Sequence, residues 1–181
     1  STYRLTAIIE FSNGETLVFV DMRRLGTLRM YEDLKPLLQR LGPEPLDSDL
    51  TPETLEKSLS RHRIPIKAAL LDQHIVAGIG NMYADEALHR AGIHPLTPAH
   101  ELTHRQVVFL WEAIRYVLEQ AIICQGASIN TYRLPNGERG SAHDAFNVAH
   151  RKGAQCLRCG TSIERIMVRK RGAYFCPTCP A

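Results

Sequence analysis

Apolar residues recur at helical spacing across the middle of the chain. The longest such stripe consists of Val107, Leu110, Trp111, Ile114, Val117, Leu118 and Ile122. This spacing is typical of a helix that packs one face on a core. Thr103 followed by Gln106 has the form of a capping box, so the pattern predicts a helix that begins after Thr103 and ends near Gln125. Trp111 lies on the apolar stripe, which favours a place in the core over a role as a base-stacking platform.

Three shorter helices are predicted upstream. Thr51 and Pro52 start one that runs to about Ser60, and Pro65 occupies the first turn of another that runs to Leu71. A third helix is predicted over Met82–Ala91, with Asn81 as its N-cap and Gly92 as its end. The middle of the chain is therefore expected to be a helical body.

The beginning of the chain has a different pattern. Tyr3–Phe11 and Glu15–Val20 are predicted as strands joined at an Asn13-Gly14 turn, and a third strand is predicted over Thr27–Tyr31. Three strands are too few for an independent sandwich with a good core. We therefore interpret them as the remnant of a larger β-sandwich, with a small three-stranded sheet packed on the helical body as the alternative. Gly42–Asp49 has the composition of a linker.

Four cysteines near the end of the chain form two C-x-x-C pairs, Cys156/Cys159 and Cys176/Cys179. Each pair can wrap one zinc ion from a tight turn, and four thiolates fill a tetrahedral shell without leaving a position for water. The spacing therefore predicts one structural Zn²⁺ rather than a catalytic one, with disulfides or free thiols as the alternative. No basic-then-apolar leader opens the chain, so we expect a reducing, cytoplasmic setting.

Strand-forming residues lie between the two cysteine pairs, with Arg169, Lys170, Arg171 and Gly172 as the predicted turn. This predicts a zinc-ribbon hairpin with three cations at its tip. Residues 151–181 hold seven Lys or Arg and one acid, a charge of +6, while the whole chain carries only +3. A basic segment on a slightly acidic body favours a polyanion partner, with an ordinary solvated surface as the alternative. No apolar run approaches the ~18 residues of a membrane span.

A second anion site is predicted at Gly78-Ile79-Gly80-Asn81. Glycines just before a helix leave backbone N–H groups open, and the helix dipole adds partial positive charge there. Lys67, on the preceding helix, could reach the same anion. A phosphate is the expected occupant, although a G-x-G at a helix start is often only a turn.

Three stretches together resemble the formamidopyrimidine-DNA glycosylase family. They are G-I-G-N-M-Y-A-D-E-A-L-H-R-A-G-I-H-P, S-I-N-T-Y-R-L-P-N-G-E-R-G and the four-cysteine hairpin, and D-M-R-R-L-G and L-G-P-E-P-L fit the family's interdomain region. The resemblance implies an α+β fold. Its parts would be the end of an N-terminal β-sandwich domain (1–33), an interdomain linker (34–50), a helix–two-turn–helix DNA-binding domain with a lesion loop (51–150) and a zinc finger (151–181).

The resemblance also implies a bacterial, cytoplasmic, monomeric base-excision-repair enzyme. Such an enzyme removes oxidised purines such as 8-oxoguanine and formamidopyrimidines from double-stranded DNA, and cleaves the strand at the abasic site by β,δ-elimination. Asn81, supported by Lys67, and Arg171 would bind phosphates. Arg23 would face the orphaned cytosine, and Leu25 would be the wedge against the opened stack, where many members have phenylalanine. The loop that covers the flipped base would include Arg133, Asn136, Gly137, Glu138 and Arg139.

The sequence departs from the family in its catalytic residues. Family chemistry uses an N-terminal proline amine as nucleophile, an adjacent glutamate and a lysine, and none of these has a counterpart here. Ala142 and His143 also stand where the family has an aromatic residue and a glutamine. We therefore expect this chain to bind DNA without catalysing excision. The alternatives are an endonuclease VIII-like enzyme for oxidised pyrimidines, a non-catalytic zinc protein that binds DNA or RNA, and a zinc-stabilised protein-interaction domain.

Overall fold

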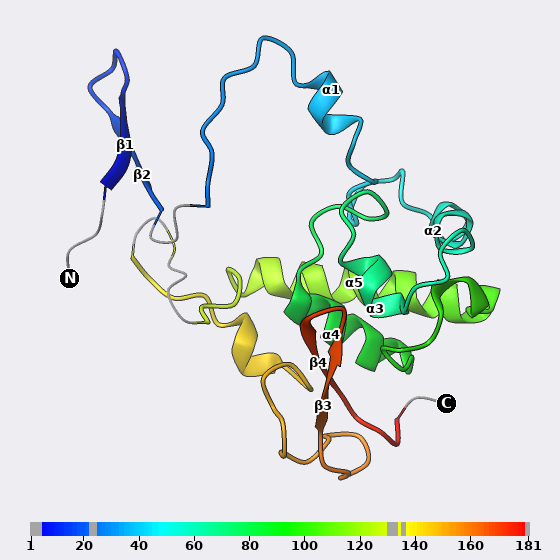
Figure 1. Ribbon diagram of the computed structural model, residues 1–181. Helices are drawn as coiled ribbons and strands as arrows, with labels where there is room; N and C mark the ends of the chain where they lie inside the picture. The colour runs from blue at the N-terminus through cyan, green and yellow to red at the C-terminus, as the bar shows by residue number, and fades with distance from the viewer. Residues whose placement is uncertain (1–4, 22–24, 130–133, 135–136, 180–181) are drawn as a thin grey trace. The chain divides into compact units, whose positions relative to one another are not determined.

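The computed structural model describes residues 5–21, 25–129, 134 and 137–179. The chain divides into two compact units, residues 1–36 and residues 37–181, which are considered separately. No helix among the described residues is long and apolar enough to cross a membrane. The elements are mixed, with short antiparallel strand pairs at both ends of the chain and helices between them (Figure 1).

The described residues of the first unit form one antiparallel hairpin, β1 (Leu5–Glu10) and β2 (Thr16–Val20), as predicted. Gly14 in the connecting turn has φ +86°, a conformation that favours glycine. Leu17 and Val18 are adjacent in β2, so they point to opposite faces, and both are about half exposed. The hairpin therefore carries partly exposed apolar side chains on both faces, and a two-stranded hairpin by itself is only marginally stable in water.

The predicted third strand is wrong. Residues 27–31 are irregular in the structure, and Leu28 and Met30 are exposed, with Met30 completely so. A strand requires a neighbouring backbone to pair with, and the apolar alternation of this segment does not find one within the described part of the unit. A short helix, α1 (Lys35–Leu38), follows at the boundary between the two units.

The second unit is built on a helical core. It contains α2 (Pro52–Leu59), α3 (Ile66–Leu70), α4 (Asn81–Ala91) and α5 (His104–Ile123), with 3₁₀ turns at Ala99–Glu101 (η1) and Ala142–Ala145 (η2). Both α2 and α4 pack on α5 (Figure 1). The predicted capping box at Thr103 and Gln106 is confirmed. Trp111 packs against the core and donates its indole N–H to the carbonyl of Leu50 at 2.6 Å, which confirms its predicted structural place.

The segment predicted as a linker packs closely on the helical body. The Gly42 amide donates to the carbonyl of Gln73 at 2.7 Å, and the Ala77 amide donates to the carbonyl of Pro43 at 3.1 Å. A side chain at position 42 would collide with the backbone of Ile75, since an added Cβ would lie 2.6 Å from it. Glycine at position 42 therefore allows this segment to lie directly against the loop that precedes α4.

The zinc-ribbon hairpin consists of β3 (Glu164–Val168) and β4 (Arg171–Phe175), paired antiparallel. The predicted four-residue turn is too long by two, because Arg171 and Gly172 are the first residues of β4 and only Arg169 and Lys170 form the turn. Both turn residues have positive φ, +44° and +67°. Two consecutive positive-φ residues are the mark of a two-residue turn whose twist matches that of its strands.

Candidate metal centre and anion-binding groove

The four cysteines of the ribbon lie together. The Sγ–Sγ distances are 3.6 Å for Cys156–Cys179, 3.4 Å for Cys159–Cys176 and 3.6 Å for Cys159–Cys179, and all four sulfurs lie within 4.8 Å of one another. A tetrahedral zinc with Zn–S bonds of about 2.3 Å requires sulfurs about 3.8 Å apart. The donor set and its spacing therefore fit one Zn²⁺ with a complete shell, which makes the site structural, as predicted.

Local turns place the first pair of ligands. The Gly160 amide donates to the carbonyl of Cys156 at 2.8 Å, and the Cys156 amide donates to the carbonyl of Thr161 at the same distance. Gly160 has φ +76°, which lets the chain turn sharply after Cys159. Two of the four cysteines, Cys156 and Cys176, form a small buried apolar cluster with Val148 and Ile163. The ribbon thus has a core of its own, separate from the helical core.

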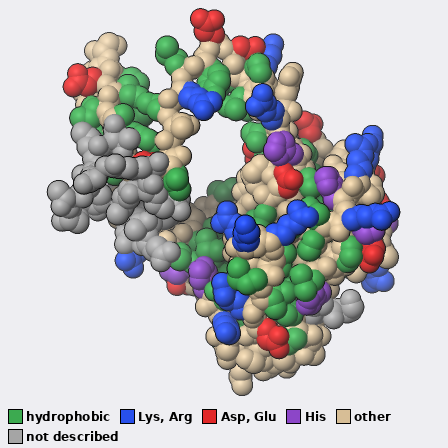
Figure 2. Space-filling view, in the orientation of Figure 1, with side chains coloured by type: hydrophobic (Ala, Val, Ile, Leu, Met, Phe, Trp, Pro, Cys, Tyr) green, Lys and Arg blue, Asp and Glu red, His purple; other side chains and the backbone are tan. Residues whose placement is uncertain are grey.

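A groove of about 510 Å³ lies between the hairpin tip and the beginning of α4. Lys and Arg side chains gather over the turn between β3 and β4 in Figure 2. The helical side contributes Ala68, Leu71, Asp72, Gln73, Ile79, Gly80 and Asn81, and the hairpin contributes Val168, Arg169 and Arg171. The structure therefore brings the predicted Asn81, Gly80 and Arg171 to one groove.

The glycine loop is held in place by Gln73. Its side-chain oxygen accepts the Gly78 amide at 2.7 Å, and its side-chain nitrogen donates to the carbonyl of Ile79 at 3.3 Å. Gly78 has φ +76°, so it serves the turn, and its amide is already bonded. Among the predicted glycines, only Gly80 lines the groove.

Asn81 is the first residue of α4, and Gly80 is its N-cap, so the prediction that Asn81 caps the helix is wrong. Because its side chain does not cap the helix, it is available to the groove. Its Oδ1 atom is buried and has no hydrogen-bond partner in the described structure. A carboxamide beside a helix N-terminus offers N–H donors to an anion.

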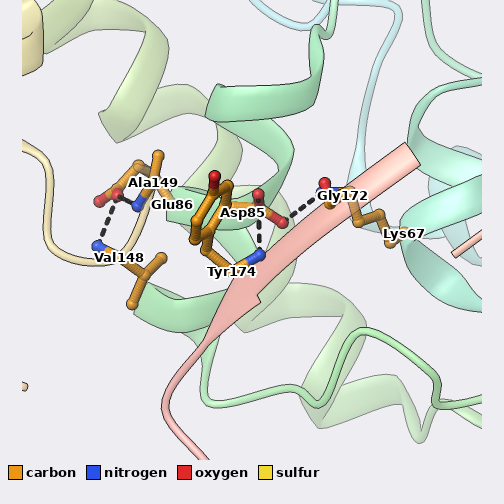
Figure 3. A network of polar contacts seen from close by, with 7 residues as sticks. All are labelled: Lys67, Asp85, Glu86, Val148, Ala149, Gly172 and Tyr174. Atoms are coloured by element: carbon orange, nitrogen blue, oxygen red, sulfur yellow. Dashed lines mark hydrogen bonds and ion pairs between the residues drawn. The ribbon is translucent and has the colours of Figure 1, made fainter. Parts of the chain in front are cut away.

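Lys67 does not line the groove, and the expectation that it contacts the anion does not fit the structure. Its side chain is fully buried and donates to Asp85 Oδ1 at 2.5 Å and to the carbonyl of Gly172 at 2.7 Å (Figure 3). The Tyr174 amide donates to Asp85 Oδ2 at 3.1 Å. Burial raises the pKa of Asp85 to about 6, against the opposing effects of Lys67 and of the Tyr174 amide. Burial also lowers the pKa of Lys67, more than Asp85 raises it.

Glu86, the next residue of α4, makes a second buried junction. Its carboxylate accepts the backbone amides of Asn147, Val148 and Ala149 at 2.8–3.0 Å, and Figure 3 shows Val148 and Ala149 beside it. Sequence reasoning missed both Asp85 and Glu86, because acidic residues on a helix are normally solvated. The signal for Asp85 was Lys67, a single cation inside the apolar run I-P-I-K-A-A-L-L.

The remaining predicted residues are only partly described. Arg23, Arg133 and Asn136 lie outside the described residues. Leu25 is 77% exposed, and it lies in the first unit. Gly137 has φ +85°, and Glu138 and Arg139 are exposed.

The base of the predicted lesion loop is closed by backbone bonds. The Ser141 amide donates to the carbonyl of Cys124 at 2.9 Å, and the Ala142 amide donates to that of Gly126 at 3.0 Å. An added Cβ at Gly140 would lie 2.2 Å from the carbonyl of Gln125, so the close approach of these two backbone segments requires glycine at position 140. The loop therefore leaves the body and returns to it at a fixed point.

Two family models match the chain. Residues 41–133 match the formamidopyrimidine-DNA glycosylase H2TH domain, and residues 155–179 match a zinc finger found in FPG and IleRS. These ranges contain the helical side of the groove and the four cysteines, respectively. The matched zinc finger agrees with the metal site derived from the cysteine geometry.

Relatives named formamidopyrimidine-DNA glycosylase are similar to this chain over almost its whole length. The formamidopyrimidine-DNA glycosylase of Chloroflexus aurantiacus is 49% identical over 173 residues, which cover 94% of this chain and 62% of the relative. The protein of the same name from Streptococcus pneumoniae is 40% identical, with coverage of 93% and 63%. The chain thus spans less than two thirds of the length of these curated relatives.

Solved structures agree with the fold. The MutM (Fpg) protein of Thermus thermophilus superimposes with a TM-score of 0.91 at 40% identity, over 99% of this chain and 69% of that one. Lactococcus lactis Fpg in complex with an abasic site containing DNA gives a TM-score of 0.85 at 34% identity, over 95% and 64%. With the matching models, relatives and folds all in agreement, the chain belongs to the formamidopyrimidine-DNA glycosylase family.

Proposed function

We propose that this chain is the DNA-binding part of a bifunctional DNA glycosylase and AP lyase that acts on oxidised purines. The observation that carries the proposal is the groove shared by Asn81 at the start of α4 and by Arg169 and Arg171 on the hairpin. A helix N-terminus faced by two guanidinium groups suits the phosphate backbone of DNA. Relatives that share the fold have been solved with abasic-site and Fapy-dG containing DNA.

Within this proposal, Asn81 and Arg171 bind backbone phosphates. Arg23, Leu25 and the loop around Gly137 act at the opened base pair, as the family resemblance implies. The 181 residues alone bind DNA without excising the base, because the relatives carry more than a third of their length outside the matched region. The nucleophile is assigned to that remaining part of the enzyme.

Binding is tested by fluorescence anisotropy with three duplexes that contain an abasic-site analogue, 8-oxoguanine or no lesion. We expect the affinity to fall steeply with salt, because phosphate contacts release counterions. Arg171→Ala is expected to reduce the slope of log affinity against log salt by about one. Lys57→Met is the matched control, since Lys57 is an exposed cation on α2, outside the groove. The absence of binding to all three duplexes would refute DNA binding and favour a protein-interaction domain, and binding that does not depend on salt would refute contacts with the phosphate backbone.

Catalysis is tested separately by borohydride trapping on an abasic-site duplex. We expect salt-sensitive binding without a covalent product. A trapped protein–DNA product would contradict the assignment of the nucleophile to the rest of the enzyme, because it would require an amine of this chain to reach C1′. Comparison of oxidised purine with oxidised pyrimidine substrates in the full-length enzyme separates this proposal from an endonuclease VIII-like activity.

A further inference from the structure

We propose that Lys67 and Asp85 are positioning residues that hold β4 against α4, so that Arg171 faces the same groove as Asn81 while Lys67 itself never touches DNA. This inference rests on the proposed function, because it explains how the two halves of the phosphate site are kept in register.

The contacts fix β4 at two points next to Arg171. Lys67 donates to the carbonyl of Gly172, which directly follows Arg171, and Asp85 accepts the amide of Tyr174. The Lys67–Asp85 pair joins these two points into one network (Figure 3). A strand that is bound to α3 through a carbonyl and to α4 through an amide cannot slide or rotate without breaking one of these partly buried hydrogen bonds.

The side chain of Arg165, which belongs to the hairpin itself, covers Gly172. The guanidinium of Arg165 lies over Gly172, where an added Cβ would come within 2.7 Å of it, and also stacks on the Tyr174 ring at 5.7 Å. The guanidinium of Arg165 therefore covers one side of the hairpin. The backbone of the hairpin is bound to Lys67 through the carbonyl of Gly172. Arg165 also lies close enough to lower the pKa of Lys67 further, beyond the larger effect of burial.

A buried ion pair is a poor source of stability, because desolvation offsets most of the attraction. What such a pair provides instead is a specific geometry, since directional bonds replace apolar packing that would tolerate several registers. Both side chains are at most 1% exposed, so neither charge is available to solvent or to a ligand. The pair is thus placed to orient the hairpin and not to bind an anion.

Glu86 provides a second attachment of the ribbon to α4. Asp85 binds β4, and Glu86 binds the amides of residues 147–149, where the chain enters the ribbon. The ribbon is therefore attached to α4 at its entrance and at its last strand by two adjacent acids. The same helix begins at Asn81, so the position of Arg171 relative to Asn81 is set through α4.

The test uses the double variant Lys67→Met/Asp85→Leu, which replaces the pair with apolar side chains and leaves no buried charge unpaired. We expect zinc content and cooperative unfolding to be retained and DNA affinity to fall about tenfold at roughly 0.1 M salt, which corresponds to the loss of one phosphate contact. Adding Arg171→Ala to this variant is expected to cause no further loss of DNA affinity, because Arg171 no longer faces the groove in the double variant.

A direct contact between Lys67 and phosphate would give a different result. The losses from the double variant and from Arg171→Ala would then add to about a hundredfold, and the slope of log affinity against log salt would fall by about two. That outcome, or an unchanged affinity in the double variant, would overturn the proposal. A loss of zinc would also overturn it, since it would show that the pair only maintains the fold of the ribbon.

Hydrogen exchange of the Tyr174 amide separates this inference from the proposed function. We expect this amide to exchange faster in Lys67→Met and in the double variant than in the parent chain. Its exchange rate is expected to be unchanged in the Lys57→Met control, and both results should hold whether or not DNA is present. If the parent chain does not bind DNA but Tyr174 responds, the proposed function fails and the positioning network stands. Protection of Tyr174 that does not change in either variant would refute the network itself.

Discussion

Arg158 donates to the carbonyl oxygens of both His89 and Arg90, at 3.1 Å and 3.0 Å. These carbonyls belong to the last turn of α4, beyond which the helix supplies no further amides, and that of His89 also accepts the Gly92 amide at 3.2 Å. Arg158 lies between Cys156 and Cys159, so one side chain joins the first zinc turn to the end of α4. Together with Asp85 and Glu86, it attaches the ribbon to α4 along the length of the helix.

Arg158→Ala is expected to lower the free energy of unfolding by about 1 kcal/mol. The reason is the loss of two hydrogen bonds from a cation at a helix C-terminus, at a partly exposed site. Urea unfolding measures the change, with zinc content checked in parallel. Arg61→Ala serves as the control, since Arg61 is exposed and lies away from the ribbon in sequence. Equal stability in the two variants would contradict a structural role for Arg158.

Cys176→Ser is expected to release zinc and unfold the ribbon while the helices remain. A structural zinc site supplies folding energy directly, and the apolar cluster of the ribbon is small and separate from the helical core. Metal analysis is expected to show well under one zinc per chain, with the helical circular dichroism signal retained. Cys124→Ser is the matched control and is expected to keep the metal, because Cys124 lies outside the four-cysteine cluster. Stoichiometric zinc in Cys176→Ser would refute the four-ligand site.

The hairpin tip carries backbone strain together with charge. Arg169 and Lys170 both have positive φ, which is costly for residues with a side chain. The double variant Arg169→Asn/Lys170→Gly has the sequence that such turns favour, so we expect the ribbon to gain about 1 kcal/mol of stability. The same variant is expected to bind DNA more weakly, with a smaller salt slope, because it loses two cations at the tip of the hairpin.

A second variant separates charge from strain at the tip. Arg169→Gln/Lys170→Gln removes both charges and keeps side chains at both positive-φ positions. We expect the same loss of salt slope as in the Asn-Gly variant, without the gain in stability. If the Asn-Gly variant binds DNA as tightly as the parent chain, the tip does not contact the phosphate backbone.

Most of the helical body could be predicted from sequence, because its signals are local. The capping box at Thr103 and the period of the apolar stripe depend only on neighbouring residues, and α5 forms where they place it. The zinc site was equally predictable, since the ligand spacing itself encodes the coordination geometry. The predicted strand at Thr27–Tyr31 was wrong because pairing depends on residues distant in sequence.

The junction between the ribbon and α4 could not be predicted, for a physical reason. Lys67 and Gly172 are 105 positions apart, and neither residue type indicates from sequence which residue it will contact. A lysine on a helix near a predicted anion site suggests a contact with the anion, and only burial reveals that its charge is used internally. The prediction for Asn81 was wrong about its local role, since Gly80 is the N-cap of α4. The glycines before Asn81 nevertheless correctly indicated that it lies at the groove.

A pair of exposed side chains links α2 to the start of α5. His104 Nδ1 lies 2.7 Å from Glu56 Oε2, and this hydrogen bond, followed by the charge of Glu56, raises the pKa of His104. The folded state therefore holds the His104 proton to higher pH than the unfolded state does. The stability that the pair contributes is fully present below the ordinary histidine pKa of about 6.5 and is lost as the pH rises through the raised value.

Titration of the His104 ring by NMR is expected to give a pKa above the ordinary value of about 6.5. Glu56→Gln removes the charge and keeps a hydrogen-bond acceptor, and it is expected to return the pKa of His104 towards that value. A pKa of His104 that does not change in Glu56→Gln would show that the pair does not form in solution, and the pH dependence of stability assigned to it would be absent as well.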